Sequence, residues 1–164
     1  MLTSDISLQK LSQPITKNHL RFLRDLYCVC RDYEISQVDW PAKQIKKFLY
    51  QQFELQQKDY SKRLQNGTKL LVSYQQKLVG RLYFYQADES FLHLVDVTLL
   101  REFRGMGIGR YLLEYVIQQA KGLGLGVSLY VDKLNPAVAF YRSLGFYEVN
   151  QVEHRILMQR PINP

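Results

Sequence analysis

The sequence predicts a single domain of the mixed α/β class. Its 164 residues are the size of one domain, and a chain of this length buries roughly 70% of its unfolded surface. Hydrophobic residues at 46% and charged residues at 23% match ordinary globular usage, which disfavours disordered, collagen-like and disulfide-scaffold classes. The hydrophobic period switches between that of helices and that of strands with no repeat, low-complexity tract or linker, so we expect residues 1–164 to form one domain.

The N-terminal part predicts one strand and two helices. Apolar and polar residues alternate over residues 6–11, as in a half-buried strand. Thr16 can cap the first helix, and Pro41 lies in the first turn of the second. The second helix is expected to end near Leu64, before the Asn66-Gly67 turn. The apolar stripes expected for the two helices are Leu20, Leu23, Tyr27 and Cys30, and Ile45, Phe48, Leu49 and Phe53.

From residue 69 onward the period becomes that of strands. Residues 69–74 and 78–85 are rich in Val, Leu, Tyr and Phe and predict a hairpin, which residues 91–100 extend as a third strand. A glycine-rich turn then leads into an amphipathic helix with the apolar face Ile108, Leu112, Leu113, Val116, Ile117 and Ala120. The remaining elements are a strand at 127–131, a short helix capped by Asn135, and strands at 146–150 and 155–158. The predicted order is β-α-α-β-β-β-α-β-α-β-β.

The net charge of +7 and the pI near 9.4 favour anionic partners, such as nucleic acid, a membrane surface or a phosphate-bearing cofactor. Residues 15–64 hold ten basic and six acidic side chains, and this surplus is spread over two helices. A solvated basic face is therefore favoured over a nucleic-acid groove. The longest apolar runs have five residues, far short of the roughly 20 that span a bilayer, so no membrane segment is expected.

The cysteines do not form a disulfide or a metal site in this prediction. Cys28 and Cys30 are two residues apart in a helical stretch, where such positions do not face each other. Together with His19, His93 and His154 they complete no metal-ligand motif, so no metal is expected. The few cysteines and an N-terminus without the pattern of a secretory signal predict a cytoplasmic protein.

The turn before the amphipathic helix is the most informative segment. Glycines let backbone N–H groups approach an anion, and the helix N-terminus adds free donors and a positive dipole end. The segment therefore predicts a phosphate site, with a tight turn that needs glycine for conformation alone as the alternative. It is not a dinucleotide fingerprint, because Arg110 stands where the third glycine would be, and no segment completes a Walker A loop. The candidate residues are Arg104, Gly105, Met106, Gly107, Ile108, Gly109 and Arg110.

Two segments resemble the signatures of a known family. Residues 97–109, which carry R-x-x-G-x-G, resemble the acetyl-CoA-binding segment of the GCN5-related N-acetyltransferases, the GNAT family. Residues 135–146, NPAVAFYRSLGF, resemble the second signature of the same family. The resemblance is close over residues 91–148 and covers the remainder by element order. The chain departs from the family at Arg101, where many members have proline, and this alters the stiffness of the loop.

The resemblance implies a mixed sheet that splays at its centre, with acetyl-CoA wedged into the gap. It implies that the backbone of Val97 and Leu99 pairs with the pantetheine arm and that main-chain N–H groups of residues 104–110 hold the pyrophosphate. Asn135 would meet the pantetheine side of the cofactor, and Arg142 would reach the nucleotide phosphates.

Acetyl transfer to an amine needs a neutral nucleophile, an oriented thioester and a proton for the departing thiolate. The resemblance implies that Tyr141 supplies this proton, with ordinary packing beside Phe140 and Phe146 as the alternative. It implies His93 as the base, and Asp96 is the fallback. The two lie three positions apart on one strand, so we expect them to face opposite sides. The alternatives are a surface position for His93 and a structural hydrogen-bonding role for Asp96.

Acceptor recognition is expected at the connection between the first two helices and at the final strand pair. The residues concerned are Tyr33, Glu34, Asp39, Trp40 and residues 151–154. Aromatic faces combined with acids suit a cationic amine. Trp40, which precedes Pro41, could instead pack the helix entrance as a hydrophobic staple.

The sequence therefore predicts an acetyl-CoA-dependent N-acetyltransferase. Direct attack in a ternary complex is expected, because no cysteine lies in the two signature segments to carry the acetyl group. The acceptor is left open among a small amine, an antibiotic-like amine, a polyamine, and a protein N-terminus or lysine. The oligomeric state is also left open, with a homodimer as one possibility. The rivals are a CoA-binding domain without turnover, acting as a sensor or interaction module, and a basic nucleic-acid-binding domain, for which no recognised module is present.

Overall fold

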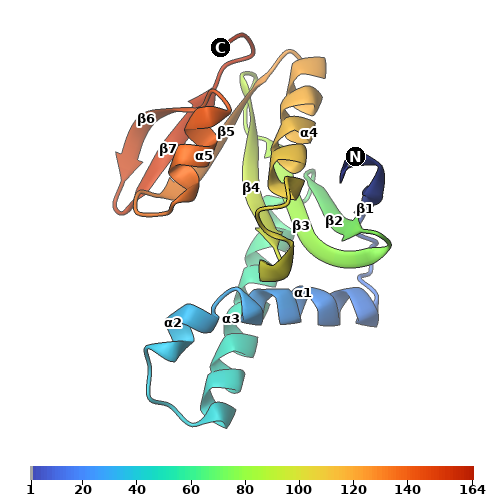
Figure 1. The fold of residues 1–164 in the computed structure, drawn as a ribbon, viewed down its shortest axis with the longest axis vertical. Helices are drawn as coiled ribbons and strands as arrows, with labels where there is room; N and C mark the ends of the chain where they lie inside the picture. The colour runs from blue at the N-terminus through green and yellow to red at the C-terminus, as the bar shows by residue number, and fades with distance from the viewer. Residues whose placement is uncertain (1) are drawn as a thin grey trace.

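The computed structural model describes residues 2–164 as one seven-stranded mixed sheet with helices on both faces (Figure 1). The strand order is β1-β2-β3-β4-β5-β7-β6, in which β4 and β5 run parallel and all other neighbours run antiparallel. The strands are β1 (Ile6–Lys10), β2 (Thr68–Tyr74), β3 (Lys77–Gln86), β4 (Phe91–Leu99), β5 (Gly126–Asp132), β6 (Tyr147–Val152) and β7 (Arg155–Arg160). The mixed α/β class predicted from the sequence is confirmed.

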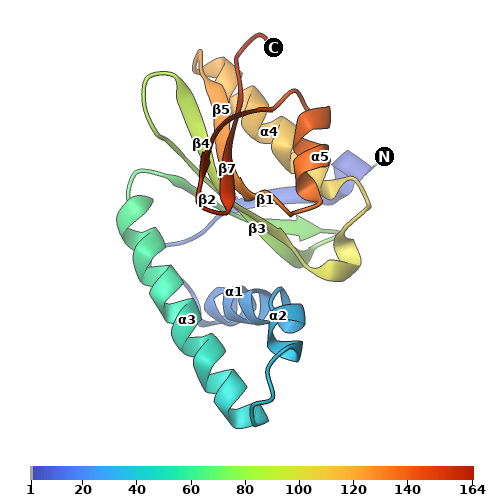
Figure 2. The same ribbon diagram turned by 90° about the vertical axis from the view of Figure 1, so that its left-hand side faces the viewer.

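The helices divide between the two faces of the sheet. They are η1 (Leu2–Asp5), α1 (Lys17–Val29), α2 (Asp32–Ser36), α3 (Ala42–Arg63), η2 (Arg101–Phe103), α4 (Ile108–Gly122) and α5 (Ala137–Ser143). Figure 2 shows α1, α2 and α3 on one side of the sheet and α4 and α5 on the other. Among the described residues, no helix combines the length and hydropathy that crossing a membrane requires.

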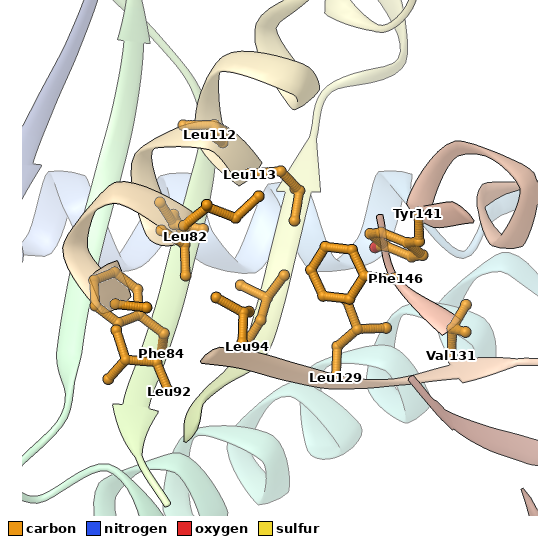
Figure 3. Packing of buried hydrophobic residues seen from close by; sticks show 14 of the residues in the cluster. Leu82, Phe84, Leu92, Leu94, Leu112, Leu113, Leu129, Val131, Tyr141 and Phe146 are labelled. Atoms are coloured by element: carbon orange, nitrogen blue, oxygen red, sulfur yellow. The ribbon is translucent and has the colours of Figure 1, made fainter. Parts of the chain in front are cut away.

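Two hydrophobic cores result, one on each face. The core under α4 and α5 includes all six positions predicted for the apolar face of α4, which are buried as expected. Figure 3 shows this packing, with Leu112 and Leu113 of α4 above Leu82 and Leu94 of the sheet. The second core lies between the sheet and the helices α1 and α3 and is formed by Leu11, Leu23, Tyr27, Leu49, Phe53, Tyr60, Leu64, Leu71 and Tyr83.

Two predicted core positions and one short helix differ from expectation. Leu20 is 41% exposed and Phe48 is 38% exposed, so their prediction as buried residues was wrong. The buried side of α3 follows Leu49 and Phe53, and a position next to such a stripe is rotated by about 100° around the helix. The short helix α2 was also missed, because five residues with none buried give no detectable period.

The sheet opens at its centre, as the sequence resemblance implied. β4 and β5 pair over four residues each, from Phe91 with Gly126 to Leu94 with Leu129. Beyond this point β4 keeps only its partner β3, and β5 keeps only β7. On β4 the parting coincides with a β-bulge, because Leu94 and Asp96 face consecutive residues of β3 and leave Val95 without a counterpart.

Candidate functional site

The parting of β4 and β5 creates a cleft of about 220 Å³. Its walls come from the two separating strands and from the start and middle of the α5 region. The residues that line it are Leu94, Val95, Asp96, Val97, Leu129, Tyr130, Val131, Asp132, Asn135 and Tyr141. Four of the residues predicted for the site, from two distant segments of the sequence, therefore meet here, and His93 does not join them.

The backbone of β4 presents unpaired polar groups to this cleft. The N–H of Leu100 donates to the carbonyl of Val79 on β3 at 2.8 Å. Because backbone groups alternate in direction along a strand, those of Leu99 and Val97 point away from β3 and toward the gap. The Leu99 carbonyl is already used, since it accepts a hydrogen bond from Arg104 Nε at 3.0 Å. The backbone of Val97 and the N–H of Leu99 therefore remain for an extended ligand.

The glycine-rich turn ends in a helix N-terminus with free N–H groups. Gly105 and Gly107 have φ values of 73° and 88°, in the left-handed region that favours glycine. Gly107 is the N-cap of α4 and has no side chain to satisfy the first helical N–H groups. The first N–H to close a helical turn is that of Tyr111, to the Gly107 carbonyl at 3.1 Å. The N–H groups of residues 108–110 are thus available to an anion.

One member of the predicted turn does not offer its N–H. The backbone N–H of Arg104 donates to the carbonyl of Arg101 at 3.1 Å, closing the 3-10 turn of η2. Its guanidinium is also engaged, with Leu99 as above and with Cys30 Sγ, 3.4 Å from Nη2. Arg104 therefore holds the end of β4 and the end of α1 together, and its backbone cannot bind the pyrophosphate in this arrangement.

Gly109 has a different explanation from the other two glycines. It lies inside α4 without a positive φ, and a Cβ placed on it would meet nothing within 4 Å. Neither backbone strain nor packing therefore requires glycine there. The absence of a side chain leaves the first turn of α4 open to close approach by a ligand.

The remaining arginines lie on two sides of α5. The guanidinium of Arg110 stands 5.7 Å from the ring centre of Phe140, so it bridges the first turn of α4 to α5. Arg142 instead borders a separate hollow that it shares with Lys133 and Glu148. The structure does not bring its side chain to the turn, and contact between Arg142 and nucleotide phosphates stays a prediction.

Tyr141 and Asn135 reach the cleft from the α5 region. The ring of Tyr141 packs at 5.6 Å from Phe140 and 5.8 Å from Phe146, and 9% of the residue is exposed. Figure 3 shows Tyr141 beside Phe146. Burial raises the pKa of its phenol, and the negative charge of Asp96 raises it further. Asn135 Oδ1 accepts the N–H of Ala137 at 2.9 Å, which starts α5, although Pro136 rather than Asn135 occupies the N-cap position.

Asp96 is held by three donors. Its Oδ2 lies 2.8 Å from Arg81 Nη2 and accepts a hydrogen bond from the Tyr60 hydroxyl at 2.7 Å, while Oδ1 accepts from Thr98. The side chains of Arg81 and Asp96 are 3% and 9% exposed. A carboxylate has about four acceptor positions, so one stays free at the cleft wall.

The expectation that His93 and Asp96 face opposite sides of the strand was wrong. The extra residue Val95 in the bulge restores both side chains to the face covered by α1 and α3. His93 nevertheless lies in the paired part of the sheet, where its Nδ1 is 2.9 Å from Ser128 Oγ. Its ring packs 5.7 Å from Tyr85 and 5.5 Å from Tyr130. Burial lowers the pKa of His93, and the charge of Arg63 lowers it further.

The residues predicted for acceptor recognition are exposed. Tyr33 and Glu34 lie on α2, and Trp40 packs edge-on against Phe48 at 5.5 Å, which supports its packing role at the entrance of α3. Residues 151–154 are exposed in the β6–β7 hairpin. Of these, the structure connects His154 to the cleft, because its Nε2 is 3.8 Å from the Oδ2 of Asp132.

Sequence reasoning missed Arg81, Tyr60 and Thr98, which hold Asp96, and also Tyr130 and Asp132, which line the cleft. Arg81 could have been noticed, since a charged residue in the middle of an apolar strand needs a buried partner. Nothing in the sequence relates Tyr60 to β4. Among residues 2–164, no three His, Cys, Asp or Glu side chains gather in a way that could hold a metal ion.

Comparison with known proteins relates this architecture to a protein family and to solved structures. A sequence model of the acetyltransferase (GNAT) family matches residues 29–146. A search of curated proteins finds no match. The chain is similar to the crystal structure of PaiA N-acetyltransferase from Thermoplasma acidophilum in complex with coenzyme A, at 18% identity and a TM-score of 0.73 over 95% of this chain and 98% of that one.

Two further solved structures share the fold. PH1933 from Pyrococcus horikoshii OT3 is 20% identical with a TM-score of 0.71, covering 97% of this chain and 99% of its own. The ribosomal-protein-S18-alanine N-acetyltransferase from Escherichia coli is 19% identical with a TM-score of 0.63, covering 97% and 95%. The family match spans most of the chain and includes the cleft, the turn and Tyr141, so the protein belongs to the GNAT family of acetyltransferases.

Proposed function

We propose that the protein is an N-acetyltransferase that moves the acetyl group of acetyl-CoA to a primary amine. The observation that carries the proposal is the cleft itself, where β4 and β5 part and Tyr141 lines the opening. The helix N-terminus with free N–H groups follows β4 and η2 in the chain. The fold neighbour PaiA N-acetyltransferase was solved with coenzyme A, which supports the same cosubstrate here.

The residues present fit such a cosubstrate. The N–H groups at the start of α4 suit a pyrophosphate, and the open space at Gly109 lets it approach them. The backbone of Val97 suits the amide groups of the pantetheine arm, since it lacks a strand partner on that side. Asn135, whose Oδ1 is used by Ala137, retains its side-chain N–H groups for the same arm.

Tyr141 is the proposed acid. The acceptor nitrogen attacks the acetyl carbon, the carbon–sulfur bond breaks, and the Tyr141 hydroxyl donates its proton to the departing sulfur. Its raised pKa keeps the phenol protonated and able to donate at neutral pH. The products are an N-substituted acetamide and free coenzyme A, and the phenol recovers a proton from solvent.

Asp96 is the proposed receiver of the acceptor's proton. Asp96 lines the cleft and keeps one of about four acceptor positions unused, so it can bind the incoming ammonium and take up its proton directly or through a water molecule. Asp132 on the opposite wall adds a second negative charge, which favours a cationic acceptor, either a small molecule or a peptide. His93 lies outside the cleft lining, so its ring would have to move to the opening to serve as the base.

The second candidate function is a CoA-binding domain without turnover. It is favoured by one observation, that three donors already occupy Asp96 while His93 lies outside the cleft.

Two measurements separate these functions. Calorimetric titration of coenzyme A into the folded protein should give saturable binding under either function, and its absence would reject both. Release of free thiol from acetyl-CoA across a panel of small amines and N-terminal peptides should then exceed the rate without acceptor. Binding with no acceptor-dependent release from any amine would leave the CoA-binding domain. Direct attack predicts that the protein mass stays unchanged after incubation with acetyl-CoA alone.

A further inference from the structure

A second hollow lies on the face of the sheet covered by α1 and α3 and shares no lining residue with the cleft. It encloses about 320 Å³ between the C-terminal part of α3, the β1–α1 connection and the start of β2. This volume is at the lower end of the range of small-molecule sites. The lining residues are Lys10, Leu11, Gln13, Ile15, Gln57, Tyr60, Ser61, Leu64, Gln65, Gly67, Thr68, Lys69 and Tyr83.

The lining is positively charged. It includes Lys69 and no acidic residue. Lys10 also borders the hollow, but its pairing with Leu70 places its side chain on the α4 face of the sheet, so Lys69 supplies the charge. The other polar residues are three glutamines, a serine, a threonine and two tyrosines, which carry neutral hydrogen-bond donors. The hydroxyl of Tyr60 is already donated to Asp96. The hollow therefore offers positive charge and donors together, which suits an anion rather than a cation or an apolar ligand.

Lys69 is the charge most affected by this environment. It lies on β2 opposite Tyr83 of β3 and is half-buried. Burial lowers the pKa of its ammonium group, and no acidic side chain acts in the opposite direction. No ion pair joins Lys69 to any residue of the described chain. A partly buried cation without a counter-charge loses favourable hydration free energy, and a bound anion would offset this loss.

We propose that this hollow is a binding site for a small molecule that carries an oxyanion, a phosphate or a carboxylate, with the Lys69 ammonium group as its main contact. Ser61 and Thr68 stand in the same lining and supply hydroxyl donors. The proposal does not depend on acetyl transfer, because the hollow is separate from the cleft.

One side chain joins the two sites. Tyr60 lines the hollow and donates its hydroxyl proton to Asp96 at the cleft wall, 2.7 Å away. Burial raises the pKa of Tyr60, and Asp96 raises it further, so this donor stays protonated. A ligand in the hollow therefore contacts the residue that helps to fix Asp96.

The test is a titration of the isotopically labelled protein with inorganic phosphate and, separately, with citrate, followed by amide chemical shifts. The expected result is saturable shifts at Lys69, Gly67 and Ser61 that persist when coenzyme A is present. Lys69→Gln should weaken binding at least about tenfold, and Lys69→Arg should retain it. Lys58→Gln is the matched control, because it removes the same charge from an exposed position of α3 outside the lining, and its affinity should match that of the unchanged protein.

The two anions separate the sources of the ligand. Saturation by phosphate alone assigns a phosphorylated ligand, and saturation by citrate alone assigns a carboxylic acid. The proposal is overturned if neither anion saturates by about 10 mM, if shifts occur only around Gly107 and vanish with coenzyme A, or if Lys69→Gln binds like Lys58→Gln. Thermal unfolding of each variant shows that lost binding does not come from lost folding.

Discussion

A substitution at Gly109 is expected to affect folding and ligand binding in opposite directions. Its helical conformation and empty surroundings mean that alanine fits the folded chain. Gly109→Ala should therefore stabilise α4 by about 0.5–1 kcal/mol. The same methyl group would stand over the N–H groups proposed for the pyrophosphate, so affinity for coenzyme A should fall about tenfold. Thermal unfolding and calorimetry measure the two effects, and higher stability with unchanged affinity would place the pyrophosphate elsewhere.

Tyr141 offers the second residue-scale prediction. Tyr141→Phe removes the hydroxyl but keeps the ring that packs between Phe140 and Phe146, so the fold should persist. The rate of thiol release at saturating acetyl-CoA should fall about 10²-fold, while the affinity for coenzyme A should change little. Steady-state kinetics with calorimetry test this. Unchanged turnover would return Tyr141 to an ordinary packing role.

At the scale of elements, one buried ion pair between β3 and β4 adds a polar contact to the apolar packing of α3 on the sheet. Arg81 of β3 and Asp96 of β4 are almost fully enclosed, and Tyr60 of α3 adds its hydroxyl. Arg81→Met should cost about 3–5 kcal/mol of unfolding free energy, because it leaves the carboxylate buried without its counter-charge. Urea unfolding measures this loss.

The chain provides a matched control for this prediction. Arg63 and Asp59 form an ion pair within α3 with side chains 48% and 54% exposed. Arg63→Met should therefore cost at most about 1 kcal/mol. Replacing Arg81 and Asp96 together by Met and Leu should recover part of the loss. A loss from Arg81→Met no larger than that from Arg63→Met would show that the buried pair does not support the fold.

The elements that the sequence predicted well are those in which the spacing of apolar residues alone distinguishes a helix from a strand. The face of α4 follows from six apolar residues at helical spacing, and the hairpin of β2 and β3 follows from apolar runs around a short turn. The bulge at Val95 could not be predicted in this way, because the register of β4 depends on its partner strand and not on its own sequence. That single residue explains why the side chain of Asp96 was assigned to the wrong face.

The candidate site was predictable where it is local and unpredictable where it joins distant segments. The turn at Gly107 and the α5 segment around Tyr141 carry recognisable patterns. Two of the three contacts of Asp96 come from α3 and β3, 36 and 15 positions away along the chain, and depend on packing that no short pattern encodes. The same holds for His93, which the sequence places near the site and the structure seats against Ser128.

At the scale of the whole molecule, stability should depend on pH through His93. The folded chain holds the pKa of His93 below its ordinary value, so below about pH 6.5 the unfolded chain binds a proton that the folded chain resists. The contribution of this group is complete above that pH and is lost as the pH falls toward the folded pKa. The unfolding free energy should therefore decrease between about pH 7.5 and 5.5.

A histidine variant isolates this effect. His93→Gln should show a smaller decrease over the same range, measured by urea unfolding at several pH values. His154→Gln, at an exposed position beside Asp132, should keep the full decrease. Equal pH dependence in the unchanged protein and in His93→Gln would show that burial of this ring is not linked to folding.

The division into two faces gives the molecule its functional geometry. The turn of α4 and Tyr141 belong to the face with α4 and α5, whereas Asp96 belongs to the face with α1 and α3. The proposed cosubstrate and acceptor thus approach from opposite faces and meet only where β4 and β5 separate. This arrangement suits transfer within a ternary complex.

The separation of β4 from β5 also gives the sheet an edge in its interior. Beyond Leu94 the rim of β4 carries hydrogen-bonding groups without a neighbouring strand. Such a rim is a template for any extended chain, including another copy of the protein. A molecule bound in the opening covers these groups. The ligand-bound protein should therefore self-associate less than the ligand-free protein.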